Sequence, residues 1–113
     1  MTGPSRYARE ASAIILAARE AVGSLGMDRD ELAAYISAVL GDDVPLEEFE
    51  FWEIGGVPAG DVMLVCAVVI REAAAAGYPV ATDVRASAER ASSGLPRLPP
   101  GDPVRELLNR RPE

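Results

Sequence analysis

The side chains that most often carry chemistry in proteins are scarce in this sequence. It contains no histidine, no lysine and one cysteine, Cys66. A zinc site, a Ser/His/Asp triad and a Cys/His pair all require histidine or several cysteines. Gly55-Gly56 has neither the spacing nor the following lysine of a phosphate-binding loop. We therefore expect no enzyme activity, no cofactor and no metal site, and the 18 acidic residues leave a carboxylate pair or a magnesium site as an open alternative.

Acidic residues are concentrated in the middle of the chain. The sequence has a formal net charge of -7, but residues 27–63 carry ten acidic residues against Arg29 alone, a net charge of -9. The flanking parts, 1–26 and 64–113, each have a net charge of +1. This distribution predicts that the middle segment attracts a protein partner with a basic surface. The candidate partner-binding residues are Asp42, Asp43, Glu47, Glu48, Glu50 and Phe51.

A first helix is predicted to start inside this acidic segment. Asp28 followed by Glu31 is the pattern of a capping box, in which each side chain accepts a hydrogen bond from the other residue's backbone. Gly41 is a typical residue for the end of that helix. Between these signals, apolar residues recur at helical spacing: Leu32, Tyr35, Ile36, Val39 and Leu40.

A second helix is predicted to follow after a short turn. Pro45 suits its first turn, and Ile54-Gly55-Gly56 ends it. Leu46, Phe49 and Trp52 fall on one face, which predicts that Trp52 anchors the core. Phe51 lies off that face, so it either contacts a partner or packs on the turn after the helix.

The two helices resemble those of the Cro/repressor-like, or XRE-type, helix-turn-helix family. The resemblance covers roughly residues 8–76 and rests on Leu32-Ala33 and on a Trp-Glu-x-Gly pattern followed by Pro and Asp-Val: Trp52, Glu53, Gly55, Pro58, Asp61 and Val62. It implies a DNA-binding regulator of transcription whose second helix reads the major groove. The family's recognition helix usually presents Ser, Thr, Gln, Asn, Arg or Lys to DNA, whereas this one presents Glu47, Glu48, Glu50 and Phe51.

The remaining segments predict an all-α fold, a small helical domain of four to five helices with a helix-turn-helix core and a Pro-rich C-terminal tail. A first helix is expected from Ser5 to about Val22, and another over Thr82–Ala91, capped by Thr82 or Asp83. We divide the chain into a domain at 1–91 and a tail at 92–113, with a possible short helix at Val104–Arg111.

The apolar run Val62–Ile70 is the most ambiguous segment. Its β-branched residues would suit a buried strand, but it continues without a break into Arg71–Ala76 and Gly77, which favours a helix. Such a helix must be covered on nearly every side, either by a homodimer or by the first helix and the C-terminal segment. Cys66 within the run is interpreted as a small buried hydrophobe. The run is too short to span a bilayer. Because there is one cysteine and no recognisable signal peptide, we expect a cytoplasmic protein.

Three functions follow as hypotheses. The first is a non-enzymatic regulatory protein that uses the acidic helix-turn-helix to bind protein in transcription regulation. The second is direct DNA binding by the resembled family's mode, with contacts from the Arg-bearing first helix (Arg6, Arg9, Arg19) and from Arg97, Arg105, Arg110 and Arg111. The third is a small assembly protein that forms a homodimer through Val62–Ile70.

Overall fold

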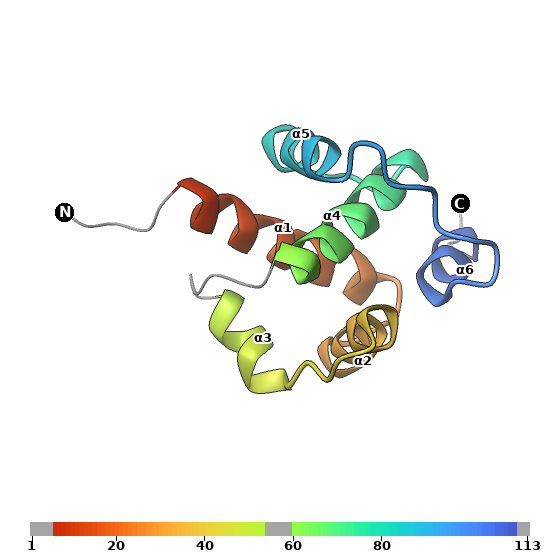
Figure 1. The fold of residues 1–113 in the computed structure, drawn as a ribbon. Helices are drawn as coiled ribbons and strands as arrows, with labels where there is room; N and C mark the ends of the chain where they lie inside the picture. Colours follow the sequence, from red (N-terminus) through yellow and green to blue (C-terminus); the bar gives the residue numbers. More distant parts are fainter. Residues whose placement is uncertain (1–5, 54–59, 111–113) are drawn as a thin grey trace.

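The computed structural model describes residues 6–53 and 60–110, and these form an all-α fold (Figure 1). The predicted all-α class is confirmed, and the helix-turn-helix core stays a prediction. The described residues contain no strand, so the strand alternative for Val62–Ile70 is wrong. None of the described helices is both long and apolar enough to cross a membrane. The helices are α1 (Arg6–Ser24), α2 (Arg29–Leu40), α3 (Leu46–Glu53), α4 (Gly60–Ala75), α5 (Thr82–Ala91) and α6 (Pro103–Asn109).

The start and end signals of α2 act as the sequence predicts. The Asp28 carboxylate accepts a hydrogen bond from the backbone N–H of Glu31 at 2.9 Å, and the Glu31 carboxylate accepts one from the N–H of Asp28 at 3.0 Å. Gly41 ends the helix with φ 76°, a left-handed conformation that favours glycine. Its N–H donates to the carbonyl of Ser37 at 2.8 Å.

Helix α4 is the central helix of the molecule. Figure 1 shows it crossing α1, with α5 on one side of this pair and α2 and α3 on the other, and α4 contacts α1, α2, α5 and α6. Val62, Cys66, Ala67, Val69 and Ile70 are buried. Cover for α4 therefore comes from within the chain, mainly from α1 and α5, with smaller contributions from α2 and α6. Of the two alternatives, cover by the chain itself is the one found. A homodimer through this run stays a prediction.

Helix α4 ends at Ala75, and Gly77, the expected capping glycine, follows it with φ 95°. The following N–H, that of Tyr78, reaches back to the carbonyl of Ala73 at 2.9 Å, the pattern of a Schellman motif. Helix α5 has the predicted bounds, but the predicted cap is wrong. Ala81 is the N-cap residue, and its methyl side chain cannot accept a capping hydrogen bond. The Asp83 carboxylate accepts from the N–H of Val84, the next residue in the helix.

The C-terminal segment has more structure than a tail. Asp102 caps α6, accepting hydrogen bonds from the N–H groups of Val104 at 2.9 Å and Arg105 at 3.3 Å. Val104 and Leu108 are buried in the same hydrophobic core as α1, α2 and α4. The described part of 92–113 thus packs on the helices of 1–91, and α6 begins at Pro103, one residue before the expected helix.

Candidate protein-binding surface

The predicted partner-binding residues lie together on the turn after α2 and on α3. Asp42, Asp43, Glu47, Glu48 and Glu50 are all exposed, and we call these five residues the acidic surface. They face solvent because α2 ends at Gly41 and because the core-facing part of the turn is Val44, which is 8% exposed. The N–H of Val44 donates to the Ser37 hydroxyl at 2.9 Å, which fixes the turn against α2.

Phe51 is the most exposed large apolar side chain among the described residues, at 58%. This exposure leaves its ring accessible to a partner, and the turn named as its alternative packing site lies outside the described residues. The structure does not describe the side chains of the predicted core face of α3, which are Leu46, Phe49 and Trp52. The side chains of the resemblance motif from Glu53 to Pro58 also lie outside the described part.

One member of the acidic surface, Glu50, forms an ion pair with Arg29, the one basic residue of the segment 27–63. Arg29 Nη1 donates to Glu50 Oε2 at 2.8 Å, and the two side chains are 27% and 53% exposed. An exposed pair of this kind contributes roughly 0–1 kcal/mol, so its main effect is on local charge. No basic residue, asparagine or glutamine occurs between Asp30 and Gly60, so the sequence offers no second pairing partner within this segment.

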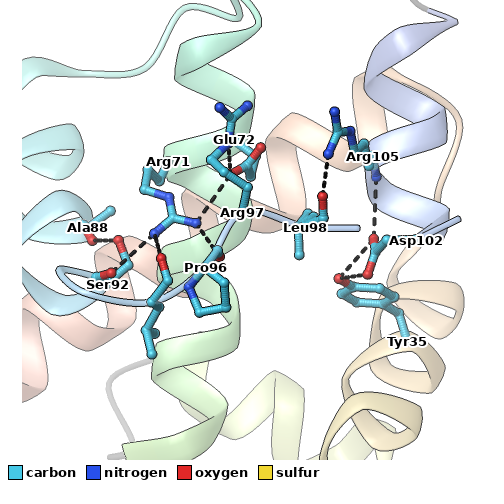
Figure 2. Close-up of polar contacts among 11 residues, drawn as sticks. Tyr35, Arg71, Glu72, Ala88, Ser92, Pro96, Arg97, Leu98, Asp102 and Arg105 are labelled. Atoms are coloured by element: carbon cyan, nitrogen blue, oxygen red, sulfur yellow. Dashed lines mark hydrogen bonds and ion pairs between the residues drawn. The ribbon is translucent and has the colours of Figure 1, made fainter. Parts of the chain in front are cut away.

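Of the four C-terminal arginines proposed to contact nucleic acid, two are bound to other parts of the chain (Figure 2). Arg97 Nε donates to Glu72 Oε2 at 2.7 Å, and Arg105 Nη1 donates to the carbonyl of Leu98. Arg110 is exposed, and Arg111 lies outside the described residues. The exposed cationic surface at the C-terminus is therefore smaller than the sequence suggests.

The C-terminal segment is held to α4 by Arg71. Its guanidinium donates to the carbonyls of Ser92 at 3.1 Å and Pro96 at 2.8 Å, as Figure 2 shows. It also donates to the carbonyl of Leu95 at 2.9 Å and to Glu72 Oε2 at 3.2 Å. An arginine suits this role because its planar group carries several donors in fixed directions. The turn at 92–98 is thus bonded to the central helix rather than being a loose linker.

Glu72 is a buried carboxylate, 4% exposed, that joins Arg71 and Arg97. Burial disfavours its ionised form, but the hydrogen bonds from Arg97 and Arg71 outweigh that effect and lower the pKa of the carboxyl. The same hydrogen bond, which Arg97 donates to Glu72, raises the pKa of Arg97. Both shifts indicate that the ion pair is formed at neutral pH.

A second buried polar contact ties α2 to α6. The Tyr35 hydroxyl lies 2.8 Å from Asp102 Oδ2 and 3.1 Å from Oδ1, across 67 residues of sequence (Figure 2). Burial raises the pKa of Tyr35, and the hydrogen bond to Asp102 raises it further. Tyr35 therefore stays protonated and donates to the carboxylate that caps α6.

Cys66 offers no accessible chemistry. The thiol is fully buried on α4, and that burial raises the pKa of Cys66 to about 12. Its interpretation as a small buried hydrophobe is confirmed. Among the described residues, no three His, Cys, Asp or Glu side chains lie close enough together to hold a metal ion.

No protein-family model matches this chain, and no curated protein or solved structure is significantly similar to it. The functional argument therefore depends on the surface itself.

Sequence reasoning missed two apolar residues that the structure exposes. Val39 was expected to pack inward with Leu32, Tyr35 and Ile36, but it is 51% exposed. Leu95, in the predicted linker, is 39% exposed. Helical spacing alone does not separate Val39 from its buried neighbours, because the difference is set by where α4 and the C-terminal segment stop covering α2.

Proposed function

We propose that this chain is a non-enzymatic regulatory protein that binds a basic protein surface through the turn after α2 and α3. The observation that carries the proposal is the exposure of Asp42, Asp43, Glu47 and Glu48 on neighbouring elements. We interpret α2 and α3 as a divergent helix-turn-helix, and the target as a cationic surface of the transcription machinery, such as a transcription factor or a polymerase subunit.

Electrostatics favour protein over DNA as the partner. A DNA-binding surface gains affinity by neutralising phosphates with Arg and Lys, and reads bases with Arg, Asn or Gln. The acidic surface offers carboxylates instead, and repulsion between these and phosphates is weakly screened within a Debye length of about 8 Å. The exposed ring of Phe51 beside these acids adds an apolar contact of the kind enriched at protein interfaces.

The test is affinity capture from the native host with DNase present, using the full chain and a charge variant. We expect partners with basic surfaces to be captured by the wild type and lost with Glu47→Gln/Glu48→Gln. The matched control is Glu20→Gln/Glu106→Gln, which removes the same charge from exposed positions on α1 and α6. Equal capture by both variants would contradict the proposal. So would tight, sequence-dependent DNA binding by the isolated protein at low salt.

The second candidate is direct DNA binding, favoured by the exposed Arg110 on the C-terminal side of α6 and by the resemblance motif. It expects an affinity that falls steeply as salt rises. It also expects that affinity to collapse in Arg110→Ala/Arg111→Ala. Binding that does not depend on salt would count against it.

The apolar run on α4 leaves less accessible surface for a homodimer than the sequence suggested. In the run Val62–Ile70, Met63, Leu64, Val65 and Val68 stay half-buried, and the other residues are covered within the chain. Light scattering that shows only monomer at micromolar concentration would remove this proposal.

A further inference from the structure

Two of the three large apolar side chains that the described residues expose lie in one groove. Val39 and Leu95 line it, and Phe51 on α3 does not. The groove has a volume of about 300 Å³ and lies between α2, α4 and the segment 95–99. Its lining is mostly apolar and includes Tyr35, Val65, Val68 and Leu98. Exposed apolar side chains gathered in one concave site mark a binding surface more often than scattered ones do.

Hydrogen bonds behind the groove hold its walls in place. Arg71 fixes the carbonyls of Leu95 and Pro96, and Arg105 fixes that of Leu98. On the opposite wall, the Tyr35 hydroxyl is bonded to Asp102. Figure 2 shows the contacts made by Pro96, Leu98 and Tyr35. Because its backbone is fixed, the segment does not need to be ordered by a ligand, and binding loses less entropy than it would with a mobile wall.

The charges around the groove are acidic. A second cavity of about 470 Å³ shares Tyr35, Val39 and Asp102 with the first and adds Glu31 to the lining. Asp42 and Asp43 follow Val39 by three and four residues, in the exposed turn after α2. The basic residue in the lining, Arg97, is paired with Glu72 at 2.7 Å. An occupant must therefore present apolar side chains next to positive charge.

We propose that this groove takes an amphipathic segment of a protein partner in which apolar residues are flanked by Arg or Lys. The inference rests on the proposed function and names the part of the partner that the acidic surface attracts. The acids steer the basic flanks, and Val39, Leu95 and Val68 receive the apolar side chains.

A second copy of this chain fits the groove less well. The chain has a net charge of -7, so two copies repel each other. Helix α6 combines leucine with arginine, but its Val104 and Leu108 are already buried in the core of its own chain.

The experiment is selection of a random displayed peptide library on the full chain. The enriched peptides are then synthesised and titrated by fluorescence anisotropy. The groove variant is Val39→Gln/Leu95→Gln, which removes apolar surface without changing charge. The matched control is Ala75→Gln/Ala76→Gln, the same kind of change at two exposed apolar residues outside the groove. Since all four positions are exposed, thermal melts should show each variant as stable as the wild type.

We expect the enriched peptides to combine apolar residues with Arg or Lys. The groove variant should weaken their binding about tenfold or more, while Ala75→Gln/Ala76→Gln should leave it nearly unchanged. No enrichment would overturn the inference, and so would a wild-type dimer that the groove variant dissociates in light scattering.

Two further outcomes separate this inference from the proposed function. Binding of basic peptides that is lost in Glu47→Gln/Glu48→Gln but kept in the groove variant overturns the groove and leaves the proposed function standing. Enriched peptides that need Val39 and Leu95 but lack basic residues overturn the proposed function, and with it the partner chemistry inferred for the groove.

Discussion

Glu72 is the residue whose replacement tests the packing of the C-terminal segment most directly. Its carboxylate lies between Arg97 Nε at 2.7 Å and Arg71 Nη2 at 3.2 Å and is 4% exposed. Glu72→Gln keeps the size of the side chain and removes the charge. The amide can accept from one arginine but no longer neutralises both, and its own N–H₂ group faces donors.

The expected cost follows from the burial of the three groups. Removing one partner of a fully buried ion pair costs about 3–5 kcal/mol, and a hydrogen bond to a charged group contributes about 1.5–3 kcal/mol. Here the carboxylate is buried but Arg71 is 19% exposed and Arg97 is 67% exposed, so water partly replaces the lost partner. We expect Glu72→Gln to lower the free energy of unfolding by about 2 kcal/mol. For a chain of 113 residues that lowers Tm by about 8 °C.

Urea unfolding followed by circular dichroism measures this difference, and its pH dependence gives a second test. The pKa of Glu72 is lower in the folded protein than its ordinary value of 4.5, so its contribution to stability is present above pH 4.5. That contribution is lost as the pH falls through the lower, folded-state pKa. The stability difference between wild type and Glu72→Gln should therefore shrink below pH 4.5 and stay constant from pH 6 to 8.

The matched control is Glu89→Gln. Glu89 pairs with Arg85 at 3.2 Å, four residues apart on α5, with both side chains about half exposed. Such a pair contributes about 0.3–0.5 kcal/mol. If Glu72→Gln costs no more than Glu89→Gln at pH 7, Glu72 does not hold the segment and the argument for a fixed groove wall is wrong.

Three other predictions concern single side chains. Tyr35→Phe should destabilise the protein by about 1–2 kcal/mol in the same urea assay, since it removes the hydrogen bond to Asp102. Asp28→Ala should cost about 1 kcal/mol by loss of the capping bond at 2.9 Å, and Asp28→Asn should restore most of it. Cys66, fully buried and with a pKa of about 12, should react with a thiol reagent at pH 8 far more slowly in the native protein than in denaturant.

Local signals in the sequence were sufficient to place most helix ends. Each of these ends depends on residues close to it in the sequence. The capping box at Asp28, the glycine at 41 and the two ends of α5 are found where they were expected. The helical assignment of Val62–Ile70 also followed from continuity with its neighbours. Such features need no knowledge of the rest of the fold.

Contacts between distant residues could not be predicted in this way. Tyr35 meets Asp102 across 67 residues, and Arg71 meets the carbonyls of Leu95 and Pro96 from another element. The Pro and Ser content of 92–103 is typical of a linker, and nothing in it signals that an arginine on α4 will satisfy its carbonyls. The exposure of Val39 depends on how α4 and the segment 95–99 pack against α2. Because this packing joins distant residues, the sequence did not predict the groove that Val39 lines.

Three arginines make contacts inside the chain, whereas the acids of the acidic surface face solvent, and this difference favours a protein over DNA as the partner. Arg71, Arg97 and Arg105 each donate to a group on the C-terminal segment or on α4. Releasing Arg97 to bind a phosphate would leave a buried carboxylate with one partner fewer, so DNA binding there would act against folding. The acids at 42, 43, 47 and 48 lie on the surface, where binding a cation costs the fold nothing comparable. A basic partner therefore gains attraction without breaking an internal contact, which is the physical reason to search for a protein first.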